Sequence, residues 1–108
     1  MEPQFYVYIL ASRMNGTLYT GFTGDLLRRV WEHRNHVVPG FTDAHNVTRL
    51  VHYEVFGDYD LAARREFLLK RWRRVWKVRL IEAENPGWRD LYEDIADPRA
   101  QIPSYNAL

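Results

Sequence analysis

Three short segments of the chain are rich in β-branched, aromatic and other apolar residues, which is the composition of β-strands. They are residues 5–11, 17–22 and 49–56, and a glycine follows each of them within five residues. The pair Asn15-Gly16 separates the first two, and this pair is typical of tight turns because both residues tolerate a positive φ. We therefore predict a β-hairpin and a separate third strand.

The hairpin brings two tyrosines to one side of the predicted sheet. A two-residue turn would place Tyr8 opposite Thr23, and Ser12 opposite Tyr19. Directly opposite residues share a face of the sheet, and so do residues two apart along one strand. Tyr8, Tyr19 and Gly21 are therefore expected to point to the same side.

The segment after the hairpin has apolar residues at helical spacing. Asp25 is a suitable N-cap for a helix that runs to about Asn35, before Pro39-Gly40 forces a loop. Residues 36–46 show no periodic pattern. The apolar side of the helix is expected to consist of Leu26, Val30 and the Trp31 ring.

The second half of the chain predicts one long helix from about residue 61 to residue 83, capped by Asp58 or Asp60. A short helix should follow between residues 86 and 95. The element order is then β-β-α-β-α-α in one α+β unit. The long helix would have an apolar stripe formed by Leu61, Leu68, Leu69, Trp72, Val75, Trp76 and Leu80.

The length and composition fit one folded domain. With 108 residues, of which 46% are hydrophobic, the chain can form one core, which we place in residues 1–96, with a loosely ordered tail at 97–108. There is no cysteine, which excludes disulfides, thiolate metal sites and a cysteine nucleophile. No apolar run is long enough to span a membrane, and the first residues lack a secretory pattern, so we expect a cytoplasmic protein.

Charge is segregated along the chain, although the formal net charge is only +1. Residues 64–79 contain eight basic residues and one acid, Glu66, whereas residues 82–99 contain six acids and two arginines. A basic helix beside an acidic segment can present a strong local positive field despite a small net charge. Nucleic acid is therefore the first partner to consider.

Five short motifs occur in order along the chain. They are Tyr6-Val7-Tyr8, Tyr19-Thr20-Gly21, the segment from Gly21 to His33 that contains Arg29, Ala63-Arg64-Arg65-Glu66 with the lysines and arginine that follow it, and Leu80-Ile81-Glu82 with Asn85-Pro86-Gly87-Trp88. In this order they resemble the motifs of the GIY-YIG endonuclease superfamily, most closely its short single-domain bacterial branch. A further similarity is to the N-terminal nuclease domain of the excinuclease C subunit, and the resemblance covers roughly residues 5 to 92.

The resemblance implies a three-stranded antiparallel sheet flanked by helices and metal-dependent hydrolysis of DNA phosphodiester bonds. It implies that Tyr8 is a general base or positions water, and that Arg29 stabilises charge on the phosphate. Glu66 would bind one Mg²⁺ or Mn²⁺ ion, and Tyr19 and His33 would complete the site.

Elementary chemistry supports these implied roles. Arginine presents a planar fork that suits two phosphate oxygens. Arg29 and His33 are four residues apart, so they lie on one face of a helix. Mg²⁺ takes oxygen ligands and keeps several waters, so that Glu66 alone can suffice. A tyrosine with a pKa of about 10 is a poor base, which leaves proton abstraction and water positioning both open for Tyr8.

We therefore interpret the chain as a DNA endonuclease of low sequence specificity that recognises branched DNA or the DNA backbone, in DNA repair or recombination. A protein partner could supply specificity, because family nucleases usually have a second DNA-binding domain. The basic residues predicted to contact DNA phosphates are Arg64, Arg65, Lys70, Arg73, Arg74 and Lys77.

Each site residue also has a structural explanation. Tyr8 and Tyr19 could be packing residues, Arg29 and His33 could lie on a helix surface, and Glu66 could simply pair with a lysine four residues later. The main rival function is accordingly a scaffold that binds nucleic acid or a partner without cutting, since residues 35–44 lack the basic residues that relatives often carry there. A third alternative is a protein-interaction domain that uses exposed Trp72, Trp76 and Trp88.

Overall fold

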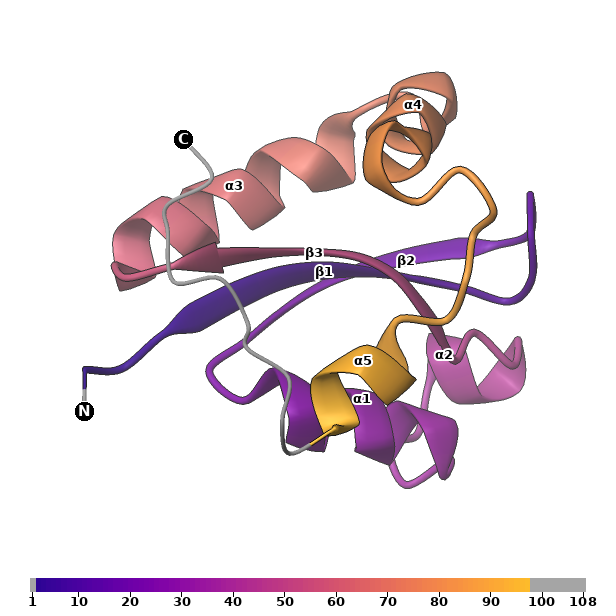
Figure 1. Cartoon of the computed structure of the whole chain (residues 1–108), viewed down its shortest axis with the longest axis horizontal. Helices are drawn as coiled ribbons and strands as arrows, with labels where there is room; N and C mark the ends of the chain where they lie inside the picture. Colours follow the sequence, from indigo (N-terminus) through magenta and orange to yellow (C-terminus); the bar gives the residue numbers. More distant parts are fainter. Residues whose placement is uncertain (1, 98–108) are drawn as a thin grey trace.

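A computed structural model describes residues 2–97 of the protein (Figure 1). Its centre is a three-stranded antiparallel sheet of β1 (Phe5–Ala11), β2 (Leu18–Thr23) and β3 (Arg49–Phe56), in the spatial order β2-β1-β3. The predicted α+β class and the antiparallel sheet are confirmed. The predicted C-terminal tail lies, beyond Asp97, outside the described residues.

Helices cover both faces of the sheet. α1 (Leu26–Arg34), α2 (Phe41–Ala44) and α5 (Tyr92–Ala96) lie on one side, and α3 (Tyr59–Arg71) and α4 (Arg74–Glu84) lie on the other (Figure 1). α2 is a short helix within the segment where the sequence shows no periodicity. None of the helices from residue 2 to residue 97 is long and apolar enough to cross a membrane.

The central strand β1 divides the core into two layers. Because successive side chains point to opposite faces, Tyr8 and Leu10 pack with the α1 layer, whereas Val7 and Ile9 pack with the α3–α4 layer. Val7, Ile9 and Leu10 are completely buried, and Tyr8 is nearly so. A strand buried on both faces explains why residues 5–11 form an almost continuous apolar run.

The register of the hairpin differs from the predicted one by two residues. Tyr8 pairs with Gly21, and Leu10 pairs with Tyr19. The Gly16 N–H donates to the carbonyl of Arg13, so the turn is centred one residue earlier than predicted, and only Asn15 of the Asn-Gly pair has a positive φ, of 59°. A shift of two residues leaves every side chain on its face, so Tyr8, Tyr19 and Gly21 still share one side.

The predicted long helix is wrong, because the chain breaks at Trp72 and Arg73 into α3 and α4. Both residues have extended backbones, with ψ of 146° and 151°. A helix over residues 61–83 would be about 35 Å long, whereas the eight-residue strand β3 spans only about 26 Å. The break lets the second segment turn back over the sheet, where Ile81 is fully buried.

Several aromatic and apolar residues lie where the sequence did not place them. Trp88 is fully buried and donates its indole N–H to Glu82, so it is not an exposed interaction residue. Trp31 is 49% exposed, and His33 takes its place on the buried side of α1. In the predicted stripe Leu69 is buried, whereas the exposed residues are Leu61, Leu68, Val75 and Trp76.

A buried charge cluster ties α3 to the sheet. Glu54 on β3 is 7% exposed and accepts hydrogen bonds from Arg65 on α3, at 2.7 and 3.0 Å, and from His52 Nε2 at 2.8 Å. Burial opposes the charge on Glu54, but these hydrogen bonds outweigh it and lower the pKa of the carboxyl from 4.5 to about 2. Because Glu66 follows Arg65 directly, the cluster also sets where Glu66 lies.

Glu54→Gln should make the protein less sensitive to acid. A carboxyl whose pKa is lowered by folding stabilises the fold above its unfolded pKa, and this stabilisation is lost as pH falls through the folded value. The loss of unfolding free energy between pH 4.5 and pH 2 should therefore be about 3 kcal/mol smaller in the variant. Urea titrations at several pH values measure it, with exposed Glu84→Gln as the control. Equal acid sensitivity of wild type and Glu54→Gln would contradict the expectation.

Candidate active site

Tyr8 lies across the backbone of β2 at Gly21. A Cβ built on Gly21 would be 2.4 Å from both Cζ and the hydroxyl oxygen of Tyr8, so the ring occupies the space that any larger residue at position 21 would need. The ring centroid of Tyr19 lies 6.4 Å from that of Tyr8 on the same face of the sheet. The paired tyrosines of the sequence therefore form one wall of a shared site.

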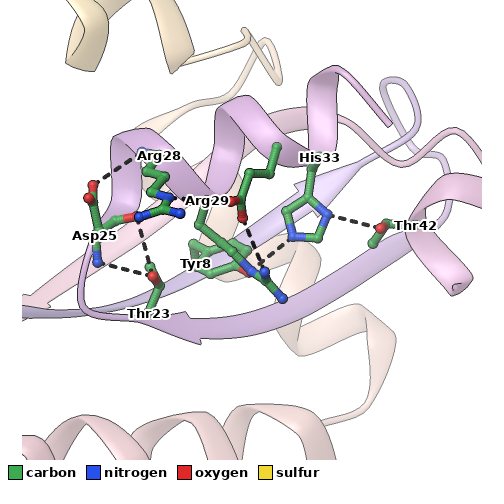
Figure 2. Close-up of polar contacts among 8 residues, drawn as sticks. Tyr8, Thr23, Asp25, Arg28, Arg29, His33 and Thr42 are labelled. Atoms are coloured by element: carbon green, nitrogen blue, oxygen red, sulfur yellow. Dashed lines mark hydrogen bonds and ion pairs between the residues drawn. The ribbon is translucent and has the colours of Figure 1, made fainter. Parts of the chain in front are cut away.

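The helix α1 brings two further side chains to the Tyr8 hydroxyl. Asp25 caps the helix by accepting the backbone N–H of Arg28, which places Arg29 and His33 on the face toward the sheet. The Arg29 guanidinium lies near enough to the Tyr8 hydroxyl to oppose the rise of its pKa, and the Nε2 atom of His33 lies 3.2 Å from the Tyr8 oxygen. Figure 2 shows these three side chains converging, as the sequence predicts.

Two residues of the site were missed by the sequence analysis. Thr42 of α2 is buried, and its Oγ1 lies 2.9 Å from His33 Nδ1 (Figure 2). Glu32 accepts from Arg29 at 3.2 Å and from Arg28 at 3.3 Å. The i,i+3 spacing from Arg29 could have indicated Glu32, but Thr42 lies in a segment without periodicity and carried no signal.

Burial dominates the protonation of the site. It raises the pKa of Tyr8 to about 12, helped by nearby Tyr19 and Glu66 and opposed by the nearby Arg29 guanidinium. Burial and the positive charge of Arg29 lower the pKa of His33. Near neutral pH, Tyr8 is therefore a neutral phenol beside a neutral imidazole.

Glu66 approaches the same site from the helix layer on the opposite face of the sheet. It belongs to α3, which packs on β1 and on the edge strand β2. Its carboxylate is close enough to raise the pKa of Tyr8, and it pairs with Lys70 at 3.0 Å. The structure thus brings Glu66 within electrostatic range of Tyr8, across the edge of the sheet.

The basic residues predicted to contact DNA are spread over α3 and α4 rather than gathered at the site. Arg65 is held by Glu54, and Arg74 donates to the carbonyls of Asn15 and Gly16, so both support the fold. Lys70 pairs with Glu66, and burial together with Lys70 lowers the pKa of Lys77. The remaining two, Arg64 and Arg73, are exposed.

The carboxylates of the site suit a hard cation that keeps its own water. From residue 2 to residue 97, no three His, Asp or Glu side chains gather in an arrangement that could enclose a metal ion. Glu66 is 23% exposed and can offer oxygen atoms to solvent. Mg²⁺ is commonly held by one or two carboxylates and substrate phosphates, so the residues present fit Mg²⁺ or Mn²⁺ rather than an enclosed zinc site.

An open cleft of about 400 Å³ lies beside the site, next to Arg29 and Glu32. Its wall includes Thr23 and Gly24, at the end of β2. The Arg29 side chain therefore lines an open cleft and also lies near the Tyr8 hydroxyl. Taken together, the site offers a donor for phosphate oxygens, a phenol–imidazole pair for moving a proton and a carboxylate for a cation.

This arrangement of a tyrosine pair, an arginine–histidine helix and a separate glutamate agrees with a match to the GIY-YIG catalytic domain over residues 4–79. The chain therefore belongs to the GIY-YIG family, as its motifs predict. Its curated relatives are UPF0213 proteins of similar length, which confirms the likeness to the short single-domain branch.

Among these relatives, a UPF0213 protein of Desulfotalea psychrophila is 32% identical over 92 residues, which are 84% of this chain and 83% of the relative. One from Natronomonas pharaonis is 38% identical over 84 residues and matches over 98% of its own length. The solution NMR structure of a UPF0213 protein from Bacillus halodurans has a TM-score of 0.51 and 28% identity, and the match covers 91% of this chain and 99% of that one. The fold is therefore shared along nearly the whole chain.

Proposed function

We propose that the protein is a metal-dependent DNA endonuclease of low intrinsic sequence specificity. The observation that supports it best is the convergence of Arg29 and His33 on the buried Tyr8 hydroxyl. A packing tyrosine does not require two basic groups at its oxygen. Phosphodiester hydrolysis does require a proton acceptor near the attacking water and a donor aimed at the phosphate oxygens.

In this proposal, Tyr8 relays a proton from the attacking water to His33 and is not ionised beforehand. A pKa of about 12 keeps the phenol protonated. As a water oxygen attacks phosphorus, the water gives a proton to the Tyr8 oxygen and the phenolic proton moves to His33 Nε2. The P–O bond to the leaving sugar oxygen breaks, and that oxygen takes a proton from solvent. His33 then loses its extra proton to solvent.

Arg29 and Glu66 supply the charge that this reaction needs. Arg29 stabilises the negative charge that develops on the non-bridging oxygens, and in doing so exchanges its bond to Glu32 for one to phosphate. Glu66 would hold one Mg²⁺ or Mn²⁺ ion, releasing Lys70. When bound, that ion supplies Lewis-acid stabilisation of the phosphate.

The exposed Arg64 and Arg73 are the strongest candidates to contact DNA backbone phosphates outside the site. Lys70 joins them once Glu66 holds a cation. Because such contacts release counterions, affinity should fall with salt and depend little on sequence. The substrate class we propose is accordingly DNA recognised by its backbone or by branching, with a partner protein supplying further specificity.

Glu66→Gln should abolish Mg²⁺-dependent cleavage while leaving the fold intact. The amide keeps the shape of the side chain but removes the charge that would hold the cation, and Glu66 is on the surface of α3. The test incubates wild type and the variant with supercoiled plasmid and with branched DNA, in Mg²⁺, Mn²⁺ or EDTA. We expect nicking by the wild type only with metal, reduced roughly 10³-fold in the variant.

A control for this assay is Glu84→Gln, which removes an exposed carboxylate of α4 far along the chain from the site. It should cut as the wild type does. If the wild type cuts no better than Glu66→Gln, the proposed nuclease activity is rejected.

One observation favours the rival function of a binding module that does not cut. Both functional charges already have partners, Arg29 with Glu32 and Glu66 with Lys70. If the wild type does not cut but binds DNA with strong salt dependence, this rival is the better description.

A further inference from the structure

We propose that a second open cleft, between α1 and α5, binds one unpaired nucleobase of the DNA strand that lies at the active site. This inference rests on the proposed function and deepens it, because it assigns a site to a part of the substrate other than the phosphate. α1 and α5 contact each other on the same face of the sheet (Figure 1). The α1–α5 cleft has a volume of about 390 Å³, and its lining residues are Trp31, Arg34, Asn35, Thr48 and Tyr92.

An exposed tryptophan lines this cleft. Trp31 is 49% exposed, although Leu26 and Val30 of the same helix are buried in the core. A planar aromatic ring open to solvent is a surface on which a base can stack, and the stacking depends little on sequence because every base has a π-face. Trp31 therefore offers the flat apolar surface that a nucleobase needs.

Asp90 holds other parts of the cleft wall in place. Its carboxylate pairs with Arg34 and accepts the backbone N–H groups of Leu50, at 3.2 Å, and Tyr92, at 3.0 Å. The Arg34 guanidinium in turn lies 4.3 Å from the centre of the Tyr92 ring. These contacts join α1, β3 and the start of α5. The cleft is therefore formed before a ligand enters, which lowers the cost of binding.

Polar side chains of the cleft suit the edges of a base. An amide has two N–H donors and an acceptor oxygen, and Asn35 uses one donor on the carbonyl of Trp31, at 2.8 Å. The hydroxyl of Thr48 can both donate and accept. Base edges also carry donors and acceptors. Because a base must leave its pair and its stack to enter such a cleft, the ligand we propose is an unpaired base.

The α1–α5 cleft and the cleft beside the active site meet along the exposed face of α1. Arg28 and Glu32 line the cleft at the active site, whereas Trp31 and Asn35 line the second one. Each member of the first pair is three residues before a member of the second, and residues at this spacing are neighbours on a helix, with roughly 5–6 Å between Cβ atoms. A strand with a phosphate beside Arg29 can therefore lay a nearby base on Trp31.

The test measures binding in EDTA, so that it does not depend on cleavage. Full-length wild type, Trp31→Ala and Trp31→Phe are titrated against a labelled oligothymidylate and against an abasic oligonucleotide of the same length, which keeps the phosphates but has no bases. Trp31→Ala should weaken binding of oligothymidylate about ten-fold and leave binding of the abasic strand unchanged. Trp31→Phe should keep most of the affinity, because phenylalanine retains a stacking ring.

The matched control is Trp76→Ala, because Trp76 is also 49% exposed but lies on α4, in the opposite helix layer. It should bind both strands as the wild type does. Equal affinities of wild type and Trp31→Ala for oligothymidylate, or an equal loss on the abasic strand, would overturn the inference.

Two further outcomes separate the source of the base and the proposed function. Thymidine monophosphate should compete only weakly with oligothymidylate; if it competes equally well, the cleft takes a free nucleotide and the assignment to a DNA strand is overturned. The expected loss in Trp31→Ala, in a protein that cuts no DNA when metal is added, would reject the nuclease and leave the base site in place.

Discussion

Arg29→Ala should reduce the rate of DNA cleavage by roughly 10²–10³, because it removes the donor that the site aims at the phosphate oxygens. The same change removes the positive charge that lies near the Tyr8 hydroxyl and lowers its pKa. The phenol then loses the group that favours its ionised form, so its pKa should rise further. Both effects act on the chemical step, and kcat should therefore fall much more than KM rises.

The neighbouring Arg28 provides a matched control for this variant. It has the same charge, lies one residue earlier and pairs with the same Glu32, but its side chain is 75% exposed. Arg28 lines the same cleft as Arg29, but no pKa shift of Tyr8 is attributed to it. Arg28→Ala should therefore raise KM for DNA and leave kcat within about two-fold of the wild type. Equal losses in the two variants would mean that Arg29 acts only through the general positive charge of α1.

Gly21→Ala should both destabilise the fold and abolish activity. The added Cβ would lie 2.4 Å from the Tyr8 ring and hydroxyl. At this distance either the Tyr8 side chain or the backbone of β2 would have to move. Tyr8 is 1% exposed, so a displacement of its ring would break the contact of its hydroxyl with His33. We expect a loss of about 1–3 kcal/mol of unfolding free energy and cleavage near background.

Gly24→Ala is the corresponding control, because a Cβ there would meet no atom within 4 Å. Urea denaturation and plasmid nicking measured on both variants separate the two effects. Wild-type stability in Gly21→Ala would contradict the packing of Tyr8 on Gly21. A Gly24→Ala variant as unstable as Gly21→Ala would show instead that the whole turn between β2 and α1 is intolerant of side chains.

The parts of the fold that the sequence predicted are those set by local pattern. The ranges of β1 and β3 match the prediction because their apolar residues are contiguous and end at turn residues. Asp25 begins α1 as expected, since a capping side chain acts within one turn of helix. The prediction that Tyr8 and Tyr19 share a face was also correct. Side chains alternate between the two faces of a strand, so a register shift of two residues leaves each on its face.

The parts that the sequence did not predict depend on contacts between distant segments. The break at Trp72 reflects the length of the sheet that the helix must cover, which no local signal encodes. The backbone of Trp88 turns with a φ of 54°, and its indole N–H donates to Glu82 near the end of α4. Both features hold the ring in the core. Thr42 joins the site only because α2 folds back beneath His33, nine residues earlier in the chain.

The assembly of the site from two helix layers is what most needs testing. Arg29 comes from α1, on one face of the sheet, and Glu66 from α3, on the other, and both influence the same tyrosine. If they serve one reaction, their contributions cannot be independent, because residues that act as a unit show strongly non-additive losses.

The most direct measurement is single-turnover cleavage of one branched DNA in Mg²⁺ by wild type, Arg29→Ala, Glu66→Gln and the double variant. We expect the double variant to cut no more slowly than the worse of the two single variants, and each of the three to cut far more slowly than the wild type. A wild type that cuts no faster than the double variant would contradict a nuclease site. If instead the losses of the two single variants multiply in the double variant, Arg29 and Glu66 do not act in one shared site.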